Sequence, residues 1–143
     1  MLSSLVAAAA LVALIWFLGT GRFGRAQTQA WIERWTPPGS TARRLLDKHH
    51  GALRASAHYL EFGGLFLVLY WAWESTVDDG AWGFEPARAA ILALVCGVAA
   101  YLDEMHQLQS GTRQFRRVDF LHSLSGVSIA ALIVAMQAWL RGA

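Results

Sequence analysis

The stretch FLHSLSGVSIAALIVAMQAWL, residues 120–140, decides the fold class of this chain. It contains no charged residue, and its polar interruptions include His122, Ser123 and Gln137. A helix of about 20 apolar residues crosses the hydrocarbon core of a bilayer, which is about 30 Å thick. The sequence therefore predicts a membrane-spanning helix here.

Three further stretches lack charged residues: 1–21, 62–73 and 89–102. The first is as long as a membrane span, whereas the other two also suit the buried helices of a soluble protein. Because the chain has two stretches long enough to span a membrane, we interpret the two shorter stretches as spans as well, each extended by its flanking residues. The expected fold is an all-α, four-transmembrane-helix bundle in a single domain over 1–143. Its spans are predicted at about 2–21, 57–76, 86–104 and 119–140.

The composition agrees with a membrane protein. Hydrophobic residues make up 55% of the 143 residues and charged residues 15%, against roughly 45–50% and about 25% in ordinary soluble domains. That is too little charge for the surface of a plain soluble enzyme. The single Cys96 excludes an intramolecular disulfide and a multi-cysteine zinc site. A net charge of +2 gives no reason to expect a nucleic-acid partner.

Residues 22–57 form the longest expected connection between spans. Within it, Trp31, Ile32 and Trp35 are spaced to share one side of a helix. This pattern is typical of a short interfacial helix between the first and second spans. The sequence PPGS at 37–40 should end that helix.

The first segment has an alternative interpretation as a cleaved signal peptide. It lacks a basic region at its start and a convincing cleavage site before Arg22, so we favour a retained span. Most arginine and lysine residues fall in the connections 22–57 and 103–119. This distribution favours a cytoplasmic location for both connections, with both termini outside.

Ionisable residues gather where the spans begin or end. Arg54, His58 and Glu61 are spaced i, i+4 and i+7, so they line one face of the helix that leads into the second span. Ionisable groups at membrane depth are costly and tend to face a polar partner inside the bundle. The alternative is an ion-paired stripe that extends to the membrane interface.

The third span ends in DEMHQ, residues 103–107. Acids at a helix C-terminus oppose the helix dipole, so Asp103 and Glu104 are poorly explained as caps. A solvated helix end is the alternative. Because antiparallel neighbours place this end beside the start of the second span, we expect one polar pocket near one membrane face, containing Glu61 and the two acids.

The last span opens on a third polar stripe. Its members, at helical spacing, are Asp119, His122 or Ser123, and Gly126. Gly126 and Ala130 form a small-x-x-x-small pair, which allows helices to approach closely. Arg116 and Arg117 are interpreted as membrane anchors on the inner side.

A metal site is an alternative interpretation of these patterns. The pairs His58-x-x-Glu61 and Asp103-x-x-His106 together offer ligands that suit a divalent transition metal. Two-residue motifs of this kind are frequent, however, and no third histidine stands at a fixed spacing. The sequence-based expectation is therefore no metal and no other cofactor.

Two blocks of the chain match motifs of one family at that family's spacing. Residues 54–62, RASAHYLEF, align without a gap with Arg-Lys-x-Ala-His-Phe-x-Glu-Tyr. The segment DEMHQ at 103–107, followed by Arg113, Asp119 and Gly126, matches an Asp-Glu-x-His-Gln motif, a Gly-Arg turn, an aspartate and a glycine that opens the last helix. The chain thus resembles the VanZ-like family of small bacterial integral membrane proteins.

The resemblance implies that the chain is a single VanZ-like domain and a multi-pass protein of the bacterial cytoplasmic (inner) membrane. It also implies a link to glycopeptide (teicoplanin) resistance. The chain departs from the family pattern at three places. Ala55 stands where a second basic residue is usual, Gly111-Thr112 where Pro-Gly precedes the arginine, and Ser123 where an aspartate or asparagine is usual. The residues predicted to form the ligand-binding pocket are Arg54, His58, Glu61, Asp103, Glu104, His106, Gln107, Arg113 and Asp119.

Three functions fit these patterns. We favour a membrane protein of the cell envelope that binds an anionic lipid or a lipid-linked intermediate, with Arg54 and Arg113 holding its phosphate through bidentate hydrogen bonds. Membrane lipids are then its partners. The second is a membrane-embedded enzyme that uses histidine and carboxylate acid–base chemistry on such a lipid. The third is a purely structural helix bundle. The catalytic candidates under the second are His58, Glu61, Asp103, Glu104 and His106.

Overall fold

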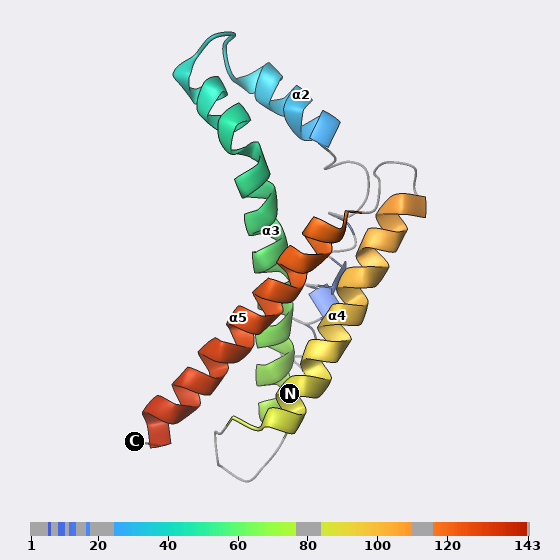
Figure 1. The fold of residues 1–143 in the computed structure, drawn as a ribbon, viewed down its shortest axis with the longest axis vertical. Helices are drawn as coiled ribbons and strands as arrows, with labels where there is room; N and C mark the ends of the chain where they lie inside the picture. The colour runs from blue at the N-terminus through green and yellow to red at the C-terminus, as the bar shows by residue number, and fades with distance from the viewer. Residues whose placement is uncertain are drawn as a thin grey trace.

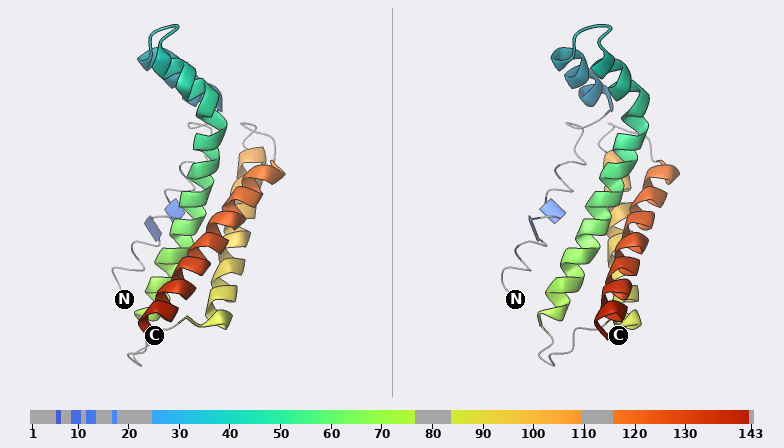
Figure 2. Two further views of the ribbon diagram at one scale, coloured as in Figure 1. Left: turned by 60° about the vertical axis from the view of Figure 1, so that its left-hand side comes forward. Right: turned by 90° about the vertical axis from the view of Figure 1, so that its left-hand side faces the viewer.

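The computed structural model describes residues 25–76, 84–109 and 116–142, together with positions 6, 9, 10, 12, 13 and 17. Helices make up all the regular structure in the three described ranges, which confirms the all-α prediction. They are α2 (Arg25–Trp35), α3 (Thr41–Glu74), α4 (Pro86–Gln109) and α5 (Arg117–Gly142). Figure 1 shows α3, α4 and α5 side by side as a bundle, with α5 crossing α3. In all the views α2 lies beside the N-terminal half of α3, beyond the ends of α4 and α5 (Figure 2).

Two of the four predicted spans correspond to helices that are long and apolar enough to cross a membrane. These are α4 and α5, and only 28% and 33% of their most apolar windows are buried inside the protein. Both helices therefore present a largely apolar outer surface. The predicted span at 57–76 lies in α3, which is long enough to cross a membrane but is not apolar enough to count as a candidate span. The predicted span at 2–21 falls almost entirely outside the described residues.

Helix α3 is longer than the sequence analysis predicted. It begins at Thr41 and runs for 34 residues without a break, whereas residues 41–56 were expected to belong to a connection. The cause is local: this segment is rich in alanine, leucine, arginine and lysine, which are strong helix formers. Ser40 caps it, accepting a hydrogen bond of 3.2 Å from the backbone N–H of Arg43.

The short helix predicted between the first and second spans exists as α2. It is joined to α3 through Gly39, whose φ of 75° lies in the left-handed region that glycine tolerates. Two contacts hold the pair: the Arg43–Glu33 ion pair at 3.1 Å and the hydrogen bond from Gln29 Nε2 to Asp47 Oδ1 at 3.0 Å. Its location at a membrane interface stays a prediction.

Glycine contacts set the distance between α3 and α5. A Cβ built on Gly126 would lie 2.5 Å from the carbonyl oxygen of Tyr59, and one built on Gly63 would lie 2.9 Å from the carbonyl oxygen of Gly126. The two backbones thus touch, as the small-residue spacing of α5 predicted. The apolar core packs directly beside this crossing, where Phe62 and Phe66 are almost completely buried.

The opposite end of the bundle is held by a buried ion pair between Glu74 of α3 and Arg88 of α4. The guanidinium carbon of Arg88 also lies 6.0 Å from the ring centre of Tyr70, whose hydroxyl accepts a hydrogen bond of 3.2 Å from the backbone N–H of Glu85. A shallow groove borders this end and is lined partly by Glu74 and Arg141. Neither Glu74 nor Arg88 was among the residues predicted to form a site.

Replacing Gly126 by alanine should destabilise the protein, because the new Cβ would collide with backbone atoms of Tyr59 that cannot rotate away. Overpacking of this kind costs about 1–3 kcal/mol, which would lower the thermal unfolding midpoint of the detergent-solubilised protein. Gly64→Ala is the matched control, since no described atom lies within 4 Å of its added Cβ. The control should leave the midpoint unchanged or raise it. Equal midpoints for Gly126→Ala and wild type would contradict the close contact.

Candidate functional site

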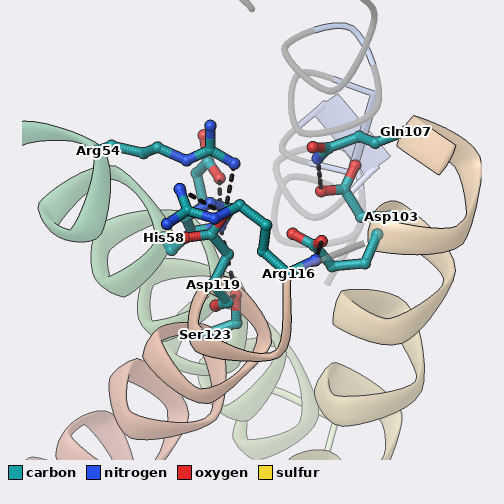
Figure 3. Close-up of polar contacts among 9 residues, drawn as sticks. Arg54, His58, Asp103, Gln107, Arg116, Asp119 and Ser123 are labelled. Atoms are coloured by element: carbon teal, nitrogen blue, oxygen red, sulfur yellow. Dashed lines mark hydrogen bonds and ion pairs between the residues drawn. The ribbon is translucent and has the colours of Figure 1, made fainter. Parts of the chain in front are cut away.

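An ion pair between α3 and α5 forms the centre of the site. The guanidinium of Arg54 donates a hydrogen bond to Oδ2 of Asp119, whose side chain is only 4% exposed. Arg116, just before α5, brings its Nη1 to 3.8 Å from the same oxygen. Figure 3 shows both guanidinium groups converging on Asp119. Two positive groups therefore flank one buried carboxylate.

His58 lies one helical turn after Arg54 and is buried. Its Nδ1 is 3.4 Å from Oγ of Ser123 and 3.9 Å from Oε2 of Glu61. Ser123 also donates a hydrogen bond of 3.2 Å to the backbone carbonyl of Asp119. Arg54, His58 and Glu61 do share one helical face, as predicted, and that face meets the polar stripe of α5.

Helix α4 supplies two buried acids that turn to different partners. Oδ2 of Asp103 accepts a hydrogen bond of 2.6 Å from Nε2 of Gln107 on the next turn, as Figure 3 shows. Oε2 of Glu104 accepts a hydrogen bond of 3.2 Å from the backbone N–H of Arg116. Asp103 and Glu104 are 5% and 2% exposed, so this helix end is buried rather than solvated.

Three side chains from three helices come together at this point. One ligand atom each of His58 (α3), Glu104 (α4) and Asp119 (α5) lie within 4.8 Å of one another, and all three residues are buried. Oε1 of Glu104 is buried and has no hydrogen-bond partner among the described residues. We call these three residues the triad cluster. Of its members, only His58 belongs to a paired motif considered for a metal in the sequence.

The remaining predicted pocket residues lie at different places. Arg113 falls outside the described residues. His106 is half-buried one turn after Asp103 and is not among the three converging ligands. Glu61, with a side chain 20% exposed, stands at the rim beside His58. The structure thus brings Arg54, His58, Glu104 and Asp119 into one cluster, and it keeps Asp103 and Gln107 together as a neighbouring pair.

Two residues of the site, Arg116 and Ser123, were not among the predicted pocket residues. Arg116 was interpreted as a membrane anchor, yet its backbone contacts Glu104 and its side chain approaches Asp119. Ser123 was left as an alternative to His122, and the structure selects Ser123: His122 instead packs against the ring of Tyr59, with ring centres 5.4 Å apart. Arg116 lies three residues before Asp119, and Ser123 lies four residues after it. On a helix, both spacings place a side chain next to Asp119, which was the signal in the sequence for including both residues in the site.

No family model matches the chain, and neither a curated protein nor a solved structure has detectable similarity to it. The resemblance to the VanZ-like family therefore depends on the spacing of the matched motifs. Any assignment of function has to be argued from the geometry of this site.

Removing either partner of the Arg54–Asp119 pair should cost about 3–5 kcal/mol of unfolding free energy, because the other charge is left buried and unpaired. The double variant Arg54→Ala/Asp119→Asn should cost clearly less than the sum of the single variants. A parallel cycle on Arg43 and Glu33, whose side chains are 24% and 51% exposed, should give a coupling of about 0.2–1 kcal/mol. Chemical unfolding in mixed micelles measures both cycles. Equal couplings would contradict a special role for the buried pair.

Proposed function

We propose that this chain is a VanZ-like integral membrane protein of the bacterial cytoplasmic membrane that crosses the bilayer four times. We further propose that it binds an anionic lipid head group, or the phosphate of a lipid-linked cell-envelope intermediate, at the end of the bundle where α3, α4 and α5 carry their polar residues. The link to teicoplanin resistance remains an implication of the family resemblance.

The membrane assignment is supported by where the apolar residues lie. Large hydrophobic side chains are exposed along the outer faces of α4 and α5, among them Leu94 at 69% and Leu132 at 69%. A soluble monomer rarely exposes so continuous an apolar surface, whereas hydrocarbon chains would cover it at no cost. The buried charges lie near the two ends of the bundle, at Asp119 and at Glu74, which fits two membrane faces.

The convergence of Arg54 and Arg116 on Asp119 carries the binding proposal. A guanidinium offers five N–H donors, and Asp119 takes only part of this capacity. Nε of Arg54 is buried without a hydrogen-bond partner among the described residues, and the side chain of Arg116 is 54% exposed. Asp119 would hold both groups in place, and their remaining N–H groups would donate hydrogen bonds to phosphate oxygens. Arg113 joins them in this proposal on the sequence motif alone.

The enzyme alternative finds less support in the geometry. In a serine–histidine–acid relay the imidazole uses one nitrogen for the serine and the other for the acid. Here Ser123 and Glu61 both face Nδ1 of His58, so the three side chains are not arranged as such a relay. Conversion of a lipid by wild type, lost in a folded His58→Ala variant, would nevertheless favour the enzyme over the binding protein.

A comparison of two neighbouring arginines tests the binding proposal. Wild-type protein exchanged into micelles with phosphatidylglycerol should retain this lipid in native mass spectrometry and should not retain phosphatidylcholine. Arg116→Ala should weaken retention about tenfold or more, since hydrogen bonds to charged groups contribute about 1.5–3 kcal/mol. Arg117→Ala is the matched control. It removes one positive charge at the adjacent position, where no described contact joins the side chain to the site.

Undiminished retention in both Arg116→Ala and Arg113→Ala would overturn the lipid-binding proposal. The structural alternative would then remain, in which the polar residues only hold the helices together.

Labelling of single cysteines tests the membrane topology. Lys48, on the N-terminal half of α3, and Gly142, the last residue of α5, are exposed. These two helix ends lie toward opposite ends of the structure (Figure 1). In intact cells, a membrane-impermeant maleimide should label only one of the variants Lys48→Cys and Gly142→Cys, and cell lysis should expose the other. Cys96 is completely buried and serves as an internal background. Labelling of both variants in intact cells would contradict a membrane between them.

A further inference from the structure

We propose that His58, Glu104 and Asp119 bind a divalent transition-metal ion of the Zn²⁺ or Mn²⁺ type between α3, α4 and α5. The proposal does not depend on lipid binding. It also replaces the sequence-based expectation of no metal, because the three ligands come from separate helices and form no local motif.

The first argument is the convergence of the triad cluster. Ligand atoms of the three residues lie within 4.8 Å of one another, and each residue is buried. Ligands around a bound Zn²⁺ stand about 2.0–2.2 Å from the metal, so small side-chain rotations bring this set to coordinating distance. One imidazole nitrogen and two carboxylates form a donor set that suits Zn²⁺ and Mn²⁺.

The second argument is an unsatisfied oxygen. Glu104 is 2% exposed, and its Oε2 is engaged by the backbone N–H of Arg116 at 3.2 Å. Its Oε1 has no hydrogen-bond partner among the described residues. A buried carboxylate oxygen without a partner costs more free energy than a neutral group does. A cation placed among the three ligands would satisfy this oxygen.

The third argument is the balance of buried charge at this end of the bundle. In the described part of the chain, Asp103, Glu104 and Asp119 are buried acids, and Arg54 is the largely buried guanidinium that faces them. Arg116, at the more exposed rim, adds a second guanidinium near Asp119. With all three acids ionised, negative charge would still exceed the positive charge of the two guanidinium groups, and a bound cation would offset the excess.

The ion pair of Asp119 with Arg54 is compatible with this site. A carboxylate has two oxygens and about four lone-pair positions, so Asp119 can accept from Arg54 at Oδ2 and still bind a metal. Ser123 lies 3.4 Å from Nδ1 of His58 and orients the imidazole. Polar groups that orient metal-binding histidines in this way are a regular part of metal sites.

Metal titration of the full-length protein in detergent tests the proposal. After treatment with a chelator, wild type should bind one equivalent of Zn²⁺ or Mn²⁺ in isothermal titration calorimetry, with the metal confirmed by elemental analysis of the dialysed protein. Glu104→Gln and His58→Ala should lose this binding. His49→Ala is the matched control: it removes an exposed histidine of the same helix and should bind as wild type does.

Cobalt provides a readout that does not depend on loss of binding. In a His58→Cys variant, Co²⁺ should produce a thiolate-to-cobalt charge-transfer band, which wild type should lack because its Cys96 is buried away from the cluster. This variant decides the question if Glu104→Gln fails to fold. Absence of metal binding by wild type, or binding unchanged in folded Glu104→Gln and His58→Ala, would overturn the proposal. The unpaired oxygen of Glu104 would then be satisfied by a proton.

Discussion

The backbone contact between α3 and α5 is the constraint on which the rest of the structure depends. Gly126 leaves no room for a side chain against Tyr59, and Gly63 leaves none against Gly126. A helical turn is 5.4 Å long, so fixing the helices at this crossing also fixes which residues meet one and two turns away. Those residues are His58 and Arg54 on α3, opposite Ser123 and Asp119 on α5. The polar site is thus a geometric result of the glycine contact.

The distribution of charge explains why the bundle has a polar end at each side of an apolar middle. Burying an ion costs several kcal/mol unless a partner and further hydrogen bonds compensate. The structure meets this requirement twice, with Arg54 and Asp119 at one end and Arg88 and Glu74 at the other. Between them, the core consists of apolar side chains such as Phe66. The first pair joins α3 to α5, and the second joins α3 to α4. The two ion pairs therefore also determine which helix ends lie next to each other.

Sequence periodicity predicted the helices and much of the polar site, because both depend on local spacing. The face shared by Arg54, His58 and Glu61, and the small residues of α5, follow directly from the 3.6-residue repeat. The outward extension of α3 was missed, since residues 41–56 are too polar to resemble a span and their helix depends on propensity and a cap. The meeting of Glu104 with His58 and Asp119 was not predictable from spacing, because it depends on how three helices rotate against one another.

The length of α3 has a consequence for the position of α2. The 34 residues of α3 would extend about 51 Å along the helix axis at 1.5 Å per residue, about 20 Å more than a hydrocarbon core. The helix runs from its cap at Ser40 to Glu74, and its N-terminal part, which carries α2, bends away from the part that packs in the bundle (Figure 2). A bilayer around the bundle would therefore leave α2 and the first turns of α3 outside the hydrocarbon core.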